Sequence, residues 1–192
     1  ESFRRAIKCD PNYDKAYNNL GLALKEQGRL DEAVESFKRA IACGQDCFQA
    51  YNNLGIVLKS KGKLGEAIAS YTKAINLNAN YADAFANLGI ALKDAGKVVQ
   101  ATSAFQRAIA LDPKHTQAYF NLAGAFEEQG KTKEAKATYQ RTIELDPSND
   151  SAKHLLAALK GETPPSAPAE YVKSLFDSYD GFDRHLVERL EY

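Results

Sequence analysis

The 192-residue chain lacks the features that mark nucleic-acid-binding and membrane-spanning proteins. It has no charge excess, because 25 Lys and Arg residues balance 25 Asp and Glu residues, and this removes a bulk electrostatic attraction to nucleic acid or to an anionic membrane. No apolar run approaches the roughly 20 residues that span a bilayer. Residues 1–20 also lack the charged-then-apolar layout of a signal peptide. We therefore expect no nucleic-acid partner and no membrane partner.

Cysteine is scarce. The three cysteines form no disulfide framework, which suits a reducing cytoplasm. Cys9 and Cys43 occupy a position that holds leucine later in the chain, so we expect both to be small buried hydrophobic residues. Cys47 lies four residues after Cys43, but no second pair and no nearby histidine completes a tetrahedral zinc site. The sequence predicts a cytoplasmic protein with no metal and no other cofactor.

Catalytic motifs are missing as well. His115, His154 and His185 lie far apart in the sequence, and no serine or cysteine is spaced with a histidine as in a known nucleophile motif. The glycines stand singly, so no glycine-rich loop is present to cradle a phosphate. We therefore predict that this chain is not an enzyme.

What the chain does contain is a period of 34 residues. Each unit carries an aromatic residue, then a leucine followed at once by a very small residue, then a glycine, an alanine and a second aromatic residue. The very small residues are Gly21, Gly55, Gly89 and Ala123; the later glycines are Gly28, Gly62, Gly96 and Gly130; the second aromatic residues are Phe37, Tyr71, Phe105 and Tyr139. A fixed period of this length indicates a repeat array.

The spacing of apolar residues predicts two helices in each unit. In the first unit, apolar residues recur every three to four positions through 14–27 and again through 30–42, so two amphipathic helices break at the glycine between them. The smallest residues allow the paired helices to approach closely, and the aromatic residues fill the wider gaps. One helix pair cannot bury its apolar face alone, whereas a stack of pairs can.

These positions resemble the tetratricopeptide repeat family. The resemblance implies an all-α fold, a right-handed α-solenoid of antiparallel helix pairs. It implies four complete units at 14–47, 48–81, 82–115 and 116–149, after the second half of a truncated unit at 1–13. Residues 150–161 begin like another first helix and end at Gly161, so we expect a helix that caps the array.

The composition changes after this helix. Residues 162–168 hold three of the six prolines, so we expect an extended linker. Residues 169–192 regain helical spacing, and they resemble the start of the catalytic domain in bacterial proteins that join tetratricopeptide repeats to an S-adenosylmethionine-dependent methyltransferase. That resemblance implies a parent methyltransferase whose cofactor-binding half is not in this chain. The alternative is a plain amphipathic extension that packs on the array.

One position on the first helices suggests a binding surface. In the resembled family these helices line a concave groove. Here an asparagine directly precedes the repeated leucine in all four units. The four are Asn19, Asn53, Asn87 and Asn121. A row of side-chain amides can hydrogen-bond the backbone of an extended peptide, and this row resembles the asparagine ladder of O-linked N-acetylglucosamine transferases. The alternative is that the amides bond the adjacent helix and hold the units in register, and both roles are compatible.

Three neighbouring positions complete the predicted groove. An aliphatic stripe gives way to Gly124, two asparagines change to Ala86 and then to an aromatic residue, and a basic line reverses sign at Glu127. The residues are Leu22, Ile56 and Ile90; Asn18, Asn52 and Phe120; and Lys25, Lys59 and Lys93. The pattern predicts a protein or extended-peptide ligand with apolar side chains and an acidic end, although a solvated lysine face is the alternative. The aliphatic stripe cannot ion-pair with a terminal carboxylate, as chaperone-tail-binding tetratricopeptide domains do.

The two ends of the chain add further candidate partners. Residues 162–192 contain seven acidic and three basic residues, a formal charge of −4, so this tail could dock in the groove of its own or another copy. The half-unit at 1–13 would expose Phe3, Ala6 and Ile7, which favours self-association. The predicted function is a protein- or peptide-binding scaffold. The alternative is the substrate-recruiting or oligomerising part of a methyltransferase.

Overall fold

The structure, a computed structural model, describes Phe3, Ile7, Asp10 and residues 13–44 and 47–162. Within these residues all regular secondary structure is helical, which confirms the predicted all-α class. The helices in chain order are α2 (Asp14–Glu26), α3 (Leu30–Cys43), α4 (Phe48–Ser60), α5 (Leu64–Leu77), α6 (Ala82–Asp94), α7 (Val98–Leu111), α8 (Thr116–Glu128), α9 (Thr132–Leu145) and α10 (Asp150–Lys160). Each unit therefore supplies a first helix of 13 residues and a second helix of 14.

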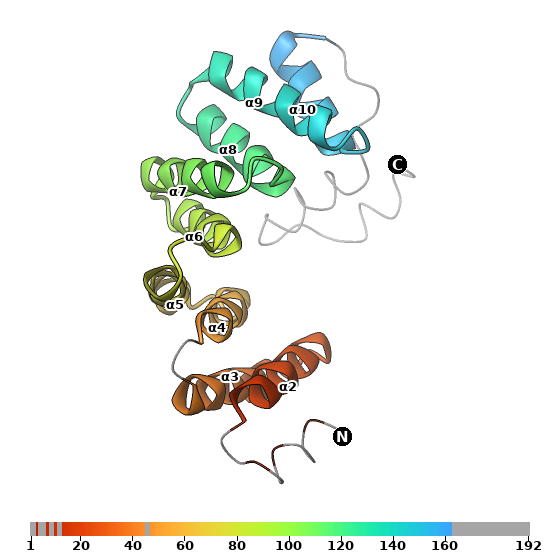
Figure 1. Cartoon of the computed structure of the whole chain (residues 1–192). Helices are drawn as coiled ribbons and strands as arrows, with labels where there is room; N and C mark the ends of the chain where they lie inside the picture. The colour runs from red at the N-terminus through yellow and green to blue at the C-terminus, as the bar shows by residue number, and fades with distance from the viewer. Residues whose placement is uncertain (1–2, 4–6, 8–9, 11–12, 45–46, 163–192) are drawn as a thin grey trace.

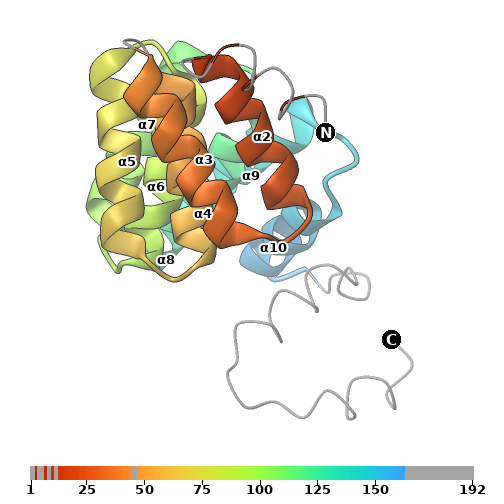
Figure 2. The same ribbon diagram turned by 90° about the horizontal axis from the view of Figure 1, so that it is seen from below.

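The helices stack in chain order into a solenoid. Figure 1 shows the units succeeding one another from the N-terminal to the C-terminal end, and Figure 2 looks along the stack from its N-terminal end, where α2 and α3 lie in front. Each helix packs on the next one in sequence, and the first helices also contact each other, α2 with α4, α4 with α6 and α6 with α8. The first helices therefore lie next to each other along one side of the array, which is the inner side.

The turn between the two helices of a unit depends on glycine. Gly28 has a φ of 72°, and the equivalent glycines of the other three units have φ values of 73°, 73° and 71°. The N–H of Arg29 donates to the carbonyl oxygen of Leu24 at 2.9 Å, and the N–H of Gly28 donates to that of Lys25 at 3.0 Å. These two bonds form a Schellman motif, which requires a left-handed residue after the helix. The predicted break at this glycine is confirmed.

The separation of the paired helices is set by a glycine that faces an aromatic ring. A Cβ added at Gly55 would lie 2.6 Å from Tyr71, and one at Gly89 would lie 2.5 Å from Phe105. Both rings are at most 1% exposed, so they have no room to move aside. The prediction that the smallest residues permit close helix pairing is therefore confirmed.

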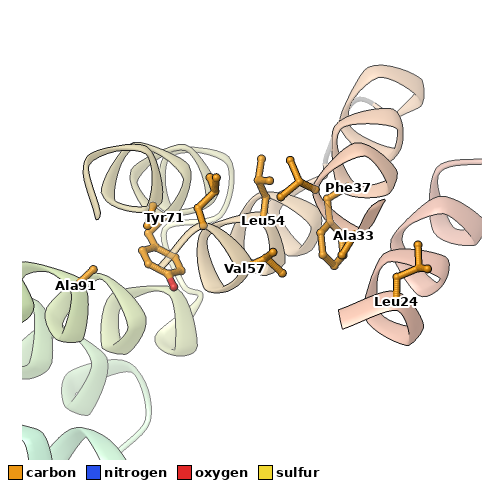
Figure 3. Close-up of a cluster of buried hydrophobic side chains, with 10 residues drawn as sticks. Leu24, Ala33, Phe37, Leu54, Val57, Tyr71 and Ala91 are labelled. Carbon is orange, nitrogen blue, oxygen red and sulfur yellow. The ribbon is translucent and has the colours of Figure 1, made fainter. Parts of the chain in front are cut away.

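The aromatic rings also join consecutive units. Phe37 and Tyr71 belong to one buried cluster with Leu54 and Val57 of α4. In Figure 3 the two α4 side chains lie between the rings of Phe37 and Tyr71, and Ala91 of α6 lies beyond Tyr71. The core is therefore continuous from one unit to the next, so that each unit depends on its neighbours for burial.

The fourth unit is closed by α10. Ala152 and Leu156 of this helix cluster with Ala123 and Tyr139, and Leu155 and Leu159 pack against the same cluster. Gly161 ends the helix with a φ of 76°. This helix lies within the predicted cap at 150–161, and it covers the apolar end of the array.

Several of the sequence-based expectations concern the two ends of the chain. The linker from residue 163 on, the tail at 169–192 and most of the half-unit at 1–13 lie outside the described residues.

The prediction that Cys43 is buried is wrong, because this residue is only half-buried. The buried cysteine is Cys47, which is 7% exposed. Cys43 is the last residue of α3, and the equivalent last residue of α5, Leu77, is likewise not buried, with 44% of its surface exposed. The thiol of Cys47 instead donates to the carbonyl oxygen of Ala40 at 3.2 Å.

Replacement of Gly55 by alanine tests the glycine–ring contact. The added methyl group would overlap the buried ring of Tyr71, so we expect Gly55→Ala to lower the free energy of unfolding by about 1–3 kcal/mol. Gly65→Ala in α5 is the matched control, because an added Cβ there has nothing within 4 Å. It should leave stability unchanged or slightly higher, since alanine restricts the unfolded chain. Urea unfolding followed by circular dichroism measures both, and an undiminished stability of Gly55→Ala would contradict the assignment.

Candidate functional site

The asparagine row links neighbouring units through side-chain amides. The Nδ2 of Asn53 donates to the Oδ1 of Asn18 at 3.0 Å, and the Nδ2 of Asn87 donates to the Oδ1 of Asn52 at 2.9 Å. Each bond joins the first helix of one unit to the first helix of the unit before it. The amides thus help to hold the inner helices in register.

The two ends of the row lack this inter-unit bond. The residue that would accept from Asn121 is Ala86, which has no acceptor, and the Nδ2 of Asn121 donates instead to the backbone oxygen of Gln117 at 2.9 Å. Asn19 is exposed, and its side chain makes no hydrogen bond within the described residues. Asn19 therefore presents its whole amide group at the surface, whereas Asn121, like the central members, has one N–H engaged.

Asn52 is the least accessible of the predicted groove residues, with 3% exposure. Its Oδ1 accepts from Asn87, and its Nδ2 donates to the hydroxyl of Tyr81 at 3.4 Å. Burial raises the pKa of the Tyr81 phenol, and the charge of Asp83 adds to the rise, so Tyr81 stays a neutral partner. Asn52 therefore serves the packing between units, whereas Asn18 is half-buried and keeps part of its amide at the surface.

The aliphatic stripe is half-buried. Leu22 and Ile56 pack against the core cluster of the first units, and Ile90 packs against the next cluster. At Gly124 the stripe is interrupted, because a Cβ added there would lie only in ordinary contact, 3.7 Å from the hydroxyl of Tyr139 and 3.8 Å from the Nζ of Lys93. The fourth unit thus contributes no side chain to the stripe, although there is room for a Cβ at this position.

Phe120 lies one helical turn before Gly124 on α8. Its ring packs edge-on against Tyr139, with the ring centroids 5.9 Å apart. The hydroxyl of Tyr139 in turn donates to the Oε2 of Glu127 at 3.2 Å. The C-terminal part of the groove therefore combines an aromatic wall with a carboxylate.

The basic line is largely neutralised by the following unit. Lys59 pairs with Asp94 at 3.2 Å, and Lys93 pairs with Glu128 at 3.5 Å. In each pair the acid is the last residue of the next first helix. At the equivalent place after Lys25 stands Ser60, whose hydroxyl donates to the backbone oxygen of Ile56 at 3.1 Å. Lys25 makes no ion pair with any residue that the structure describes.

A cleft of about 460 Å³ opens between α2 and the start of α4. From α2 it is lined by an acid–base pair of neighbours and two amides, Asp14, Lys15, Asn18 and Asn19, and from α4 by Phe48 and Gln49. The cleft thus holds the N-terminal member of the asparagine row. It is large enough for a side chain, although it is smaller than a site for a long peptide.

The sequence does not predict some contacts that the first helices make. His115 caps α8 by accepting from the N–H of Ala118 at 3.2 Å, and its Nε2 lies 3.3 Å from the Oδ1 of Asp83. The lysine–acid pairs were missed too. Each lysine and its acid stand 35 residues apart, one more than the period, and the 34-residue period does not predict this offset.

Neither a metal site nor a membrane span is found in the described part of the chain. No group of three or more His, Cys, Asp and Glu side chains there is arranged to hold an ion. No helix there is long and apolar enough to cross a bilayer.

Comparison with known proteins identifies the repeats. Two family models described as "Tetratricopeptide repeat" match residues 92–159 and 2–35, and one described as "TPR repeat" matches residues 21–62 and 57–96. Together these matches cover residues 2–159. No curated protein matches the sequence.

Solved structures show the same fold. The crystal structure of MamA has a TM-score of 0.69 at 28% identity and covers 76% of this chain and 85% of its own. YrrB, described as a TPR protein with an unusual peptide-binding site, has a TM-score of 0.70 at 24% identity, with coverages of 92% and 92%. The first TPR of Spaghetti (RPAP3), bound to the HSP90 peptide SRMEEVD, has a TM-score of 0.58 at 29% identity and covers 59% of this chain and 90% of its own.

Removal of single amides should separate the bonds between units from the bonds within one helix. Asn52→Ala deprives Asn87 of its acceptor inside the core, so we expect a loss of about 1–3 kcal/mol in the free energy of unfolding. Asn121→Ala removes only a bond within its own helix, and we expect a loss of about 0.5 kcal/mol or less. Urea titration of both variants checks the difference, and equal stabilities would contradict the inter-unit role of Asn52.

Proposed function

Because this chain belongs to the tetratricopeptide repeat family, we propose that it is a binding scaffold that holds an extended segment of another protein in the groove formed by α2, α4, α6 and α8. The observation that carries the proposal is the asparagine row on these inner helices. The proposed contacts are the amides of Asn19, Asn53, Asn87 and Asn121.

The chemistry of an amide suits this role. A primary amide has two N–H donors and a carbonyl oxygen with two lone pairs. In Asn53 and Asn87 one N–H is engaged by the preceding unit, which leaves the oxygen and the second N–H of each. An extended peptide offers alternating N–H and C=O groups that match such a set without regard to its side chains. Since Asn52 is buried, we leave it out of the proposed contact surface.

The aliphatic stripe and Phe120 supply the remaining contacts of the proposal. Leu22, Ile56 and Ile90 are half-buried, so each can still offer apolar surface to a ligand side chain. Phe120 adds an aromatic edge beside Gly124. We propose that apolar ligand side chains pack on this stripe while the backbone bonds to the amides.

A bound peptide in a similar structure supports the ligand class. The Spaghetti domain carries an HSP90 peptide, and it is 29% identical to this chain over the aligned part. Here the inner stripe consists of aliphatic residues and Gly124, none of which can pair with a terminal carboxylate. We therefore propose recognition along the backbone of a segment instead of recognition of a chain end.

The other sequence-based hypotheses stay predictions. Methyltransferase parentage and docking of the tail depend on residues 162–192, and self-association depends on the half-unit at 1–13; almost all of these residues lie outside those that the structure describes. YrrB and the Spaghetti domain are both described by their tetratricopeptide repeats, and we propose no catalytic role for this chain. A cytoplasmic location likewise remains a prediction from composition.

A pull-down with paired variants tests the asparagine row. We expect the double variant Asn19→Ala/Asn121→Ala to retain its fold, because neither residue bonds another unit within the described residues, and to lose about tenfold in affinity for captured partners. Asn76→Ala, a change of an exposed asparagine on the second helix α5, is the matched control and should bind like wild type.

The same experiment has a clear negative result. Partners are identified by mass spectrometry, and helicity and melting temperature are checked for each variant. If the folded double variant and the further variant that adds Asn53→Ala and Asn87→Ala both retain the wild-type partners at wild-type affinity, the row is not the binding site.

A further inference from the structure

The three lysines of the basic line differ in their partners. Lys59 and Lys93 each reach the acid that ends the next first helix, Asp94 and Glu128. The same arrangement would bring Lys25 to residue 60, which is a serine. The chain therefore omits one acid from an otherwise regular series of inter-unit ion pairs, and it omits it between the first and second units.

The missing acid leaves a positive charge on the inner surface. Lys25 is half-buried, and the side chains of Lys59 and Lys93 in the equivalent environment are 33% and 27% exposed. Ser60 does not replace the acid, because its hydroxyl donates to its own helix. Glu26 is adjacent to Lys25 in sequence, and neighbouring positions on a helix do not face each other. An ammonium group at this place is less well solvated than one on an open surface, which strengthens its attraction to a carboxylate.

The charges along the groove give the attraction a direction. Lys15 lies on the same helix as Lys25, ten residues before it, and lines the cleft beside Asn19. The position of the basic line in the fourth unit is Glu127, a carboxylate that accepts from Tyr139. Asp14 also lines that cleft, so the contrast lies along the basic line itself, which begins with a lysine that has no acid partner among the described residues and ends with a carboxylate. Along this line a carboxylate of the ligand is favoured at the first unit and disfavoured at the fourth.

We propose that Lys25 is a specificity-determining residue that receives a carboxylate side chain of the bound segment, and that the partner is another polypeptide with an acidic extended segment. This inference rests on the proposed groove function and adds the chemistry of the ligand. The absence of an acid at position 60 is the feature that reserves Lys25 for the ligand. The acidic residue of the segment lies over the first two units, and its apolar residues lie over the aliphatic stripe.

The test uses matched changes at the acid positions in the full chain. The probe is a fluorescent, end-blocked peptide of alternating alanine and glutamate, compared with one of alternating alanine and glutamine by anisotropy titration. Ser60→Asp supplies the missing acid and should lower the affinity for the glutamate peptide by about fivefold. Ser60→Asn, which adds similar bulk without charge, should leave that affinity unchanged. Asp94→Ser frees Lys59 and should raise the affinity for the glutamate peptide.

Each alternative outcome identifies a different failure. Equal binding of the two peptides, with loss in Asn19→Ala/Asn121→Ala, would retain the groove function and overturn the role of Lys25. Unchanged affinity in a folded Ser60→Asp variant would overturn that role as well, and failure of both peptides to bind would overturn both proposals. A synthetic copy of residues 162–192 is the third probe. If it binds more tightly than the glutamate peptide and loses affinity in Ser60→Asp, the occupant is the protein's own tail and the partner assignment is wrong.

Discussion

The contact between a very small residue on each first helix, glycine in three units and Ala123 in the fourth, and an aromatic ring on the second helix controls the geometry of this protein. At Gly55 and Gly89 the ring occupies the place where a side chain would begin. The two helices of a unit can therefore approach to the distance at which the ring is fully buried. Since a similar contact recurs in successive units, the first helices fall into equivalent positions and their side chains form rows along the inner surface.

The rows have a structural role, and the proposed function gives them a role in recognition as well. In the central units, the amides of Asn53 and Asn87 bond the preceding unit, and the ammonium groups of Lys59 and Lys93 pair with the following one. Polar groups engaged in this way hold the solenoid in register. Where one residue departs from the pattern, as at Ser60, Lys25 makes no ion pair within the described residues, and we propose that its ammonium group is left for a ligand. In this proposal the regular positions maintain the fold, while the irregular ones define the specificity.

Much of the architecture could be predicted because it depends on local spacing. The 34-residue period, the two amphipathic helices of each unit and the break at Gly28 all follow from apolar periodicity and from the backbone freedom of glycine. The prediction for Cys43 is wrong because a leucine at the equivalent position of a later unit does not show that the position is buried. The position is the last residue of the second helix, and Leu77, which occupies it in the second unit, is exposed.

The sequence by itself determined the fold class, the approximate positions of the helices and the set of side chains that lie on the first helices. These features depend on contacts within one unit. Only the tertiary structure decided that Asn52 is buried between units while Asn19 is exposed, and that Lys25 has no acid where Lys59 has one. The physical reason is that these partners lie 35 residues apart rather than 34. That offset arises from the way one inner helix is displaced against the next, and periodicity within a unit contains no information about it.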